Sequence, residues 1–406
     1  MRRIGAMMAG GAALLLTALG GGSVHAQSAA SGPVKIGVIT DKASIFADFG
    51  GQGSVVAAKM AIDDFGGSLL GRPIELISAD HQNKPDIGLG IARQWFDADG
   101  VDAVFDVLNS GLALPMQILA EEKNKLVFFS GANNIDLTGK RCSEHGFVWG
   151  YDSYSLANSN VTGIMRKPGA ESWYFITIDY ASGHNLEQDA MKVVAKNGGK
   201  VVGKIRYPLG TKDFASILLQ AQASGAQVIA LATGGADMQN ILKQSREFGL
   251  TQQVAPLFLT TMDIKGMGLD MVQGAPVVLD YYWDQSDDTR AFAKRFEAIH
   301  KRKPTDVQAT VYSSVLHYLK AVQKAGSKDT KAVIAALKAL PVNDFMTKDA
   351  AVRDDGRVLR DMYFAEVKAP DQSKYDSDYL TIVATVPGKD GFRPAAESEC
   401  PRLAKR

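Results

Sequence analysis

The stretch Val34-Lys35-Ile36-Gly37-Val38-Ile39-Thr40 decides the fold class of this chain. A run of apolar, largely β-branched residues that ends in polar and turn-forming residues is typical of a buried strand. Residues 50–65 follow with apolar side chains at helical spacing, and a second strand is predicted at residues 73–79. A strand, a helix and another strand in this order predict a parallel sheet covered by helices on both faces.

The same alternation continues and then starts again, so we predict two α/β units of similar build. The first unit adds predicted helices at 87–96 and 114–123 and strands at 101–108 and 125–129. The second has predicted strands at 172–178, 201–207, 228–232 and 256–259, with helices at 182–196, 214–221 and 238–248. The two units join near residues 149–154.

The pattern of elements in the last third of the sequence predicts that the chain crosses back between the two units. After a strand at 277–282, helices are predicted at 290–300, 311–324 and 331–340, and then two more strands at 361–367 and 380–386. A return to strands after a long helical stretch does not fit two independent domains in succession. It fits two lobes that share a chain.

Composition and charge exclude several classes of protein. The chain has 406 residues, with 45 basic and 44 acidic side chains, so the totals show no electrostatic footprint for nucleic acid. Beyond the first 26 residues, no apolar run approaches the 18 residues of a membrane span, and direct membrane insertion is not expected. Two cysteines exclude a four-cysteine zinc site and a disulfide-dense scaffold.

The N-terminus predicts export. Arg2 and Arg3 precede a weakly apolar stretch from residue 4 to 19, and Val24-His25-Ala26 places small or apolar residues where a signal peptidase cleaves. A membrane anchor is the alternative, but the run is short and interrupted by glycine. We therefore predict a signal peptide at residues 1–26 and a mature chain with 43 basic and 44 acidic residues.

No motif in the chain predicts an enzyme. The sequence contains neither a Gly-x-Ser-x-Gly nucleophile elbow nor a phosphate loop that ends in Gly-Lys-Ser/Thr. The pairs Gly51-Gln52-Gly53 and Gly266-Met267-Gly268 lack the third glycine of a dinucleotide-binding fingerprint, and the histidines lack metal-type spacing. We predict no catalytic residues, no metal and no cofactor.

Small polar and aromatic residues gather instead where predicted strands end, which is where open α/β sheets bind ligands. Each such residue alone could equally be a helix cap. Five such loops, drawn from both units, favour a binding site. These loops carry Phe46, Asn109-Ser110-Gly111, Ser130 to Asn134, Asp179-Tyr180 and Thr260 to Asp263.

Long segments in a fixed order resemble the periplasmic ligand-binding proteins of ABC importers, in the leucine/isoleucine/valine-binding group. The resemblance covers essentially the whole mature chain. The segments that carry it are VKIGVITDKASIFADFGGQGSVVAAKMAIDDFGG (34–67), LLGRPIELISADHQNKPDIGLGIARQW (69–95), NSGLALPMQILAEEKNKLVFFSGANNIDLTG (109–139), DFASILLQAQASGAQVIALATGG (213–235) and YSSVLHYLKAV (312–322).

The resemblance implies two doubly wound parallel-sheet lobes joined by a three-strand hinge, with a small-molecule ligand trapped between them. It also implies a periplasmic location, a membrane permease as partner and a monomer. By similarity, the first lobe is residues 33–151 with 284–357, the second is 152–283 with 358–393, and 394–406 is a C-terminal tail.

The family's ligand positions match this chain unevenly. The serine that binds the ligand carboxylate matches Ser110, beside Asn109, and the backbone-and-hydroxyl loop matches Gly131-Ala132-Asn133. The second lobe lacks the aromatic residue that helps amino-acid binders to hold an ammonium group, and Asp263 is the candidate acid.

These departures favour an aromatic or other organic acid over an α-amino acid. Such a ligand would use Phe46, Tyr151, Tyr154 and Tyr180 as apolar walls beside Asp179. Branched-chain or other amino-acid binding, a ligand-sensing subunit and an exported enzyme on the same fold are the alternatives.

Cys142 and Cys400 are predicted to form a disulfide. Export places the chain in an oxidising compartment, where a lone pair of cysteines usually joins. Cys400 lies in a proline-bounded tail that would fray unless it were tied down. Two unpaired thiols are the alternative, because separation in sequence says nothing about distance.

Overall fold

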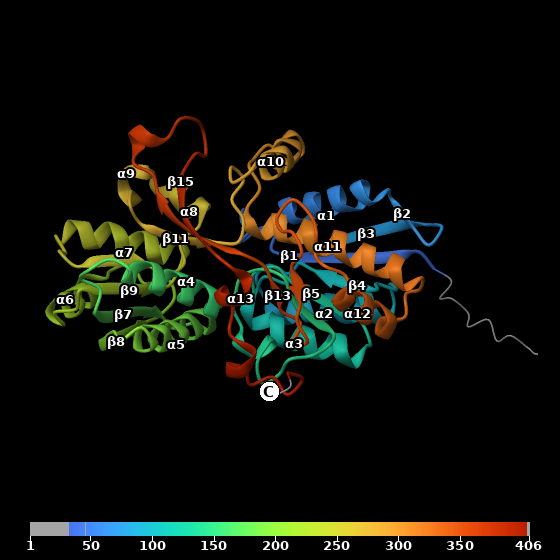
Figure 1. The fold of residues 1–406 in the computed structure, drawn as a ribbon, viewed down its shortest axis with the longest axis horizontal. Coiled ribbons are helices and arrows are strands. Elements are labelled where there is room, and N and C mark those ends of the chain that lie inside the picture. Colours follow the sequence, from blue (N-terminus) through green and yellow to red (C-terminus); the bar gives the residue numbers. More distant parts are fainter. Residues whose placement is uncertain (1–31, 45, 404–406) are drawn as a thin grey trace, which may run out of the picture.

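The computed structural model describes residues 32–44 and 46–403, which form two lobes that lie side by side (Figure 1). The first lobe is built on a six-stranded sheet, and the second on a four-stranded sheet with a separate three-stranded sheet. The predicted signal peptide and the last three residues of the predicted tail lie outside the described residues. None of the helices in the described ranges has the length and hydrophobicity that a bilayer crossing requires.

The first-lobe sheet is parallel except at one edge. Its strand order is β2-β3-β1-β4-β5-β6, and only β2 runs antiparallel to its neighbour. β1 pairs with β3 on one side and β4 on the other, so the predicted first strand is central and buried. The strands are β1 (Val34–Thr40), β2 (Ser68–Leu69), β3 (Arg72–Asp80), β4 (Ala103–Phe105), β5 (Leu126–Phe129) and β6 (Gly146–Val148).

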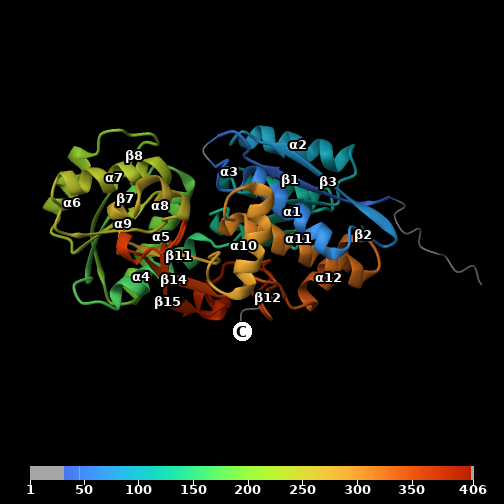
Figure 2. The ribbon, with the colours of Figure 1, turned by 90° about the horizontal axis from the view of Figure 1, so that it is seen from above.

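Helices cover both faces of this sheet. Successive strand residues point to opposite sides, so apolar strands present apolar side chains to the helices on each face. Val38 and Phe105 pack on one side, against α1 (Gly51–Phe65), α10 (Asp287–His300), α11 (Asp306–Ala325) and α12 (Thr330–Ala339). Ile39 and Val104 pack on the other, against α2 (Pro85–Asp97) and α3 (Ser110–Glu122). Figure 2 shows α2 on one side of the sheet and α1 and α11 on the other.

The second lobe has a parallel sheet in the order β10-β9-β7-β8 and an antiparallel sheet in the order β11-β14-β15. The parallel strands are β7 (Ser172–Ile178), β8 (Lys200–Tyr207), β9 (Val228–Ala232) and β10 (Gln253–Pro256). The antiparallel strands are β11 (Pro276–Leu279), β14 (Met362–Val367) and β15 (Leu380–Val386). The last two confirm the predicted late strands.

The second-lobe helices also lie on both faces of the parallel sheet. Trp173 and Phe175 pack against α4 (Ser153–Met165) and α5 (Ala181–Lys196). Tyr174 and Ile176 pack against α6 (Ala215–Ala223) and α7 (Gly235–Glu247). The short elements are α8 (Thr261–Met267), α9 (Leu269–Val272), α13 (Gly388–Gly391), β12 (Ala351–Val352), β13 (Val358–Leu359), η1 (Ile135–Leu137), η2 (Pro370–Gln372) and η3 (Ala395–Glu397).

The structure differs from the sequence prediction most clearly at two places. The strand predicted at 256–259 lies earlier, at Gln253–Pro256, so the apolar residues after it form a loop. The sequence predicted no element between residues 154 and 172, where the structure has α4. That helix is buried along most of its length, and a helix without a polar face gives no amphipathic pattern.

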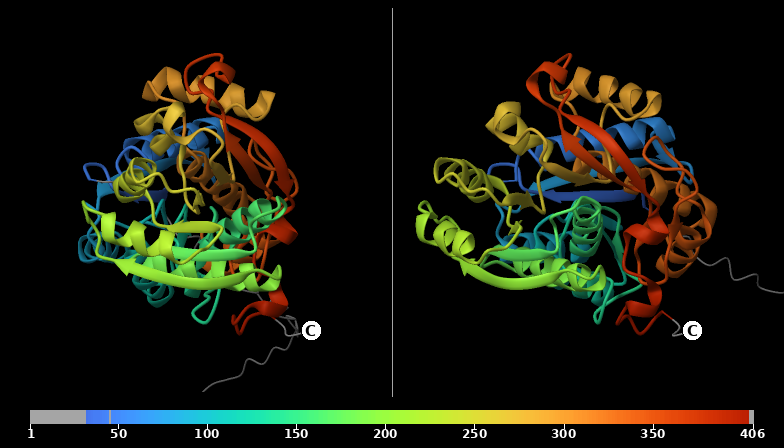
Figure 3. Two further views of the ribbon diagram at one scale, coloured as in Figure 1. Left: turned by 90° about the vertical axis from the view of Figure 1, so that its left-hand side faces the viewer. Right: turned by 60° about the vertical axis from the view of Figure 1, so that its left-hand side comes forward.

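The chain passes between the lobes three times, which confirms the predicted return. The crossovers follow β6, β11 and β13. Figure 3 shows the red C-terminal strands beside the yellow and green elements of the second lobe, although they follow the orange helices of the first lobe along the chain.

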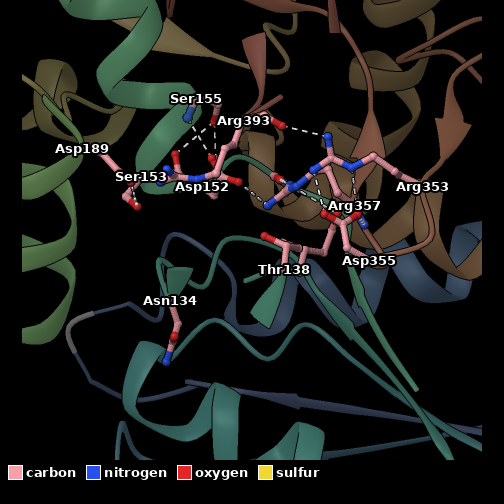
Figure 4. A network of polar contacts seen from close by, with 12 residues as sticks. Asn134, Thr138, Asp152, Ser153, Ser155, Asp189, Arg353, Asp355, Arg357 and Arg393 are labelled. Carbon is pink, nitrogen blue, oxygen red and sulfur yellow. Dashed lines mark hydrogen bonds and ion pairs between the residues drawn. The ribbon is translucent and has the colours of Figure 1, made fainter. Parts of the chain in front are cut away.

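Two buried arginines that flank β13, where the third crossover begins, hold the other two crossovers. Arg357 donates to the carboxylate of Asp152 at 2.7 Å and to the backbone carbonyl of Gly150, both in the first crossover (Figure 4). Arg360 donates to Asp280 of the second crossover at 2.7 Å and to Thr310 of α11 at 2.8 Å. Burial lowers the pKa of Arg357, and the Asp152 carboxylate opposes that change.

The predicted disulfide is present. Cys142 and Cys400 are joined, with their Cα atoms 5.6 Å apart and a sequence separation of 258. The C-terminal tail is therefore fastened to the first lobe.

Candidate functional site

The loop after β1 is shaped by one buried carboxylate. Asp41 accepts hydrogen bonds from the backbone N–H groups of Ser44 at 2.8 Å and Phe46 at 3.0 Å, and from the Ser44 hydroxyl. Burial alone would raise the pKa of Asp41, but these hydrogen bonds hold it below its ordinary value. The predicted wall residue Phe46 lies in this loop and is half-buried.

A second buried carboxyl group lies beneath the same loop. Asp106, at the end of β4, is 1% exposed and accepts a hydrogen bond from the Ser130 hydroxyl at 2.6 Å. Burial raises the pKa of Asp106 to about 6, although the hydroxyls of Ser130, Thr40 and Ser54 counteract it. A Cβ atom on Gly50 would lie 3.1 Å from the carboxylate, so the loop packs closely against Asp106 there.

Ser110 and Asn133 meet at the ends of β4 and β5, as the sequence predicts for adjacent strands. The Ser110 hydroxyl accepts a hydrogen bond from the backbone N–H of Asn133 at 3.2 Å, and both residues are buried. Asn109 caps α3 by accepting from the N–H of Leu112 at 2.8 Å. The side-chain oxygen of Asn133 has no hydrogen-bond partner among the described residues. We call Ser110 and residues 131–133 the donor corner.

The second lobe contacts this corner. Asn185, on α5, donates from its side-chain amide to the backbone carbonyl of Asn133 at 2.9 Å. Phe258, in the loop after β10, lies 6.3 Å from the ring of Phe49 and 5.5 Å from the ring of Tyr151. The two lobes therefore touch through a polar contact and through this aromatic cluster of Phe49, Tyr151 and Phe258.

Gly131 and Ala132 belong to the same contact region. A Cβ atom on Gly131 would lie 3.0 Å from the hydroxyl of Tyr151 and 2.9 Å from the Leu108 side chain. Ala132 is fully buried. Tyr151 thus lies against one side of the donor corner, and its role as a wall for a ligand stays a prediction.

Other predicted residues lie apart from the donor corner or are otherwise engaged. Tyr154, on α4, lies under the guanidinium of Arg393, which is 4.7 Å from its ring centre. Asp179 pairs with His184 at 2.8 Å and is largely exposed. Tyr180 directly precedes α5 and is half-buried.

The candidate acid Asp263 is occupied by its own helix. It closes a capping box with Thr260, accepting from the N–H of Thr260 at 3.1 Å and from its hydroxyl at 2.6 Å. The side-chain amide of Gln239 also donates to Asp263, at 3.1 Å. Both carboxylate oxygens of Asp263 are therefore hydrogen-bonded within the second lobe.

A pocket opens between the lobes beside the aromatic cluster and encloses about 830 Å³, part of it open to solvent. Phe258 lines this pocket, and none of the eleven predicted ligand residues does. Its lining residues are Asp48, residues 258–262, Lys265, residues 277–279, residues 281–283, His300, residues 302–306, Gln308, Ser377 and Tyr379.

One carboxyl group in this pocket stands out electrostatically. Burial raises the pKa of Asp306 to about 8, and the nearby carboxylate of Asp280 adds to the rise. Arg360 pairs with Asp280, whereas Asp306 has no ion-pair partner among the described residues. The backbone N–H of Val307 donates to Asp306 at 3.0 Å.

Sequence reasoning missed Phe258 and Asn185, and for different reasons. Phe258 lies within the apolar run Leu257-Phe258-Leu259, which reads as part of a buried strand. Asn185 is a polar residue within a helix, and only the arrangement of the two lobes gives it a partner. Strand and helix periodicity carry no information on that arrangement.

The geometry defines a ligand-binding protein with two hinged lobes. Across residues 32–44 and 46–403, no group of three or more His, Cys, Asp or Glu side chains is placed to hold a metal ion. The polar groups of the donor corner are suited to hydrogen bonding.

Comparison with known proteins gives the family. A family model described as periplasmic binding protein matches residues 33–374. A periplasmic binding protein from Burkholderia mallei is 42% identical, with a TM-score of 0.87 over 91% of this chain and 99% of that chain. A branched chain amino acid ABC transporter periplasmic ligand-binding protein from Burkholderia xenovorans is 44% identical, with a TM-score of 0.86 over the same shares.

A more distant relative has a similar description. An amino acid binding protein of Pseudomonas aeruginosa is 25% identical over 83% of this chain and 89% of its own length. The chain belongs to the periplasmic binding protein family. It is a ligand binder and not an enzyme, and the family places it in the periplasm.

Proposed function

We propose that this protein captures a small carboxylate-bearing solute between its lobes and delivers it to the membrane permease of an ABC importer. The observation that carries the proposal is the donor corner beside the aromatic cluster. The Ser110 hydroxyl lies next to the backbone of residues 131–133. Hydrogen-bond donors in this place replace the water that a carboxylate loses when it is buried. The relative from Burkholderia xenovorans, which is described as an ABC transporter component, supports the role in import.

An aromatic or other organic acid is the favoured ligand class. Phe49, Tyr151 and Phe258 provide apolar surface directly beside the donors, as a ring-bearing ligand requires. The acid that the sequence offered for an ammonium group, Asp263, is engaged in its capping box, and the other predicted acidic site residue, Asp179, is paired with His184.

Amino-acid binding is the second candidate, and Asp306 favours it. This carboxyl group lines the pocket next to the aromatic cluster and has no cationic partner among the described residues. An ammonium group beside it would favour the ionised form of Asp306 and pair with it. A ligand-sensing role would use the same site, and gene neighbourhood separates sensing from import.

A thermal-shift screen of the purified protein against benzoate, leucine and succinate tests the proposal. A ligand that binds only the folded state raises the apparent stability by mass action, by about 2.7 kcal/mol at one hundred times its Kd. We expect benzoate to raise the midpoint most. No shift with any carboxylate at millimolar concentration would contradict capture of a small carboxylate.

Two variants assign the binding groups for whichever solute binds. Ser110→Ala should weaken a carboxylate ligand of either class, whereas Asp306→Asn should weaken leucine and leave benzoate unchanged. If leucine binds and Asp306→Asn abolishes that binding, the amino-acid alternative replaces the favoured class.

Ligand binding should also close the lobes about the first crossover at Tyr151-Asp152. The proposed lobes are residues 33–151 with 284–357 and residues 152–283 with 358–393, and the tail starts at 394. Hinged closure around a ligand is a common response of two-lobe binders. Small-angle scattering should show compaction on saturation with ligand, and identical profiles would indicate a rigid cleft.

A further inference from the structure

The C-terminal segment, residues 393–403, leaves the second lobe and ends on the first; we call it the strap. Just before the strap, α13 packs on α4 of the second lobe and the ring of Phe392 is buried under the Arg357 guanidinium at 4.7 Å. The chain is therefore still anchored in the second lobe and hinge at residue 392.

The first half of the strap is attached to α5 of the second lobe (Figure 4). Arg393 pairs with Asp189, whose other oxygen accepts from the Ser153 hydroxyl at 2.7 Å. Glu397 pairs with Lys196 at 3.1 Å. The backbone carbonyl of Arg393 also accepts from Arg353, which precedes the third crossover, at 2.8 Å.

The second half of the strap is attached to the first lobe, in the segment between η1 and β6. The Ser398 hydroxyl donates to the carbonyl of Thr138 at 3.1 Å. The disulfide joins Cys400 to Cys142, and Arg402 pairs with Glu144. The strap is thus a fourth connection between the lobes, in addition to the three crossovers.

The disulfide decides whether this connection persists. The pairs Glu397–Lys196 and Arg402–Glu144 are between about a third and three-fifths exposed, and exposed ion pairs add little stability. A chain end held only by such contacts frays. With the disulfide closed, the seven residues from 394 to 400 span at most about 25 Å even when fully extended.

We propose that the strap is a disulfide-anchored tether that limits how far the lobes separate in the open state, and that reduction of the disulfide releases the limit. The two lobes rotate about the crossovers, and the strap adds a covalent link of fixed length beside them. The oxidised protein then has a narrower range of open conformations, and its closed conformation is more populated. This inference does not depend on which solute the protein binds.

Small-angle scattering of the ligand-free protein, dialysed exhaustively, tests the proposal. The samples are the oxidised protein, the same protein reduced with a phosphine, and the double variant Cys142→Ser, Cys400→Ser. We expect a larger radius of gyration in the reduced protein and in the double variant than in the oxidised protein, for which about 21 Å is typical at this length. Equal radii in all three samples would overturn the proposal.

Two controls separate lobe opening from fraying of the tail. A chain that ends at residue 398 lacks the disulfide and also lacks residues 399–406, which would otherwise become loose on reduction. Its radius of gyration should also exceed that of the oxidised protein. If it instead matches the oxidised protein, the rise on reduction comes from the loose tail and the proposal is wrong.

Arg402→Ala keeps the disulfide and removes only the ion pair with Glu144. Its radius should equal that of the oxidised protein, and a rise would mean that the ion pair rather than the disulfide sets the limit. Circular dichroism at the scattering temperature verifies that each variant is folded.

Discussion

Replacing Asp106 by asparagine should stabilise the protein at neutral pH. The carboxyl group is almost fully buried, and its pKa rises from 3.8 to about 6 on folding. One pH unit is worth 1.36 kcal/mol, so holding this group ionised in the folded state costs about 3 kcal/mol at pH 7.5. Asparagine keeps an oxygen for the Ser130 hydroxyl and tolerates the left-handed backbone of Asp106, whose φ is 70°.

The sign of the pH dependence follows from the direction of the shift. The folded state binds the proton of the Asp106 carboxyl group more tightly than the unfolded state does. The stability that Asp106 contributes through this proton is therefore present below pH 4 and is lost as pH rises through 6. Asparagine does not titrate. The free energy of unfolding of Asp106→Asn, relative to that of the wild type, should therefore grow between pH 4 and pH 7.5 by up to about 3 kcal/mol.

Urea unfolding at pH 4, 5, 6 and 7.5, with the disulfide intact, measures this difference. The comparison of variant with wild type at each pH cancels the other titrating groups. A difference in stability that stays constant from pH 4 to pH 7.5, or that shrinks as pH rises, would refute the reasoning. Either result would mean that Asp106 is ionised without cost beneath the binding loops.

Three further predictions concern the site, the hinge and a surface network. Ser110→Ala should weaken binding of the solute found in the screen by about 1–3 kcal/mol, as calorimetry measures, because a ligand oxygen loses its donor. Arg357→Met should lower the free energy of unfolding by about 3–5 kcal/mol, and adding Asp152→Asn should recover part of that loss in urea unfolding. Glu187→Gln should cost about 1–2 kcal/mol at pH 7, and this cost should shrink as pH falls through about 2. Burial alone would raise the pKa of the Glu187 carboxylate, but hydrogen bonds from Arg206 and Lys204 hold it at about 2; equal stability of variant and wild type at pH 7 in thermal unfolding would contradict this.

Local patterning was enough to predict most of the fold. The strands Val34–Thr40 and Ser172–Ile178 are buried apolar runs between turn residues, and the structure places them as expected. Periodicity failed for α4, because Ser153–Met165 is buried on nearly all sides and carries serine and asparagine in its interior positions. It failed at Phe258 because an apolar loop that packs in a cleft has the composition of a strand.

The candidate site could be predicted only as far as each lobe determines it. Adjacent strand ends bring Ser110 and Asn133 together, so that pairing followed from the order of the strands. Asp263 was a plausible ligand group in sequence, but its carboxylate forms a capping box that depends on Thr260 three residues earlier. The contact between Asn185 and Asn133 requires both lobes in place, and no local signal encodes it.

The interleaved order of the two lobes has a consequence for how the chain folds. The first lobe includes a pairing between Val148 and the segment at Arg357, and the hydrogen bond from Arg357 to Val148 spans 209 residues. Neither lobe has all its parts until the chain is nearly complete, and contacts so distant in sequence form slowly. A polypeptide that emerges N-terminus first therefore stays incompletely folded until its last quarter is available. The disulfide between Cys142 and Cys400, 258 positions apart, belongs to the same group of contacts, because it also needs nearly the whole chain.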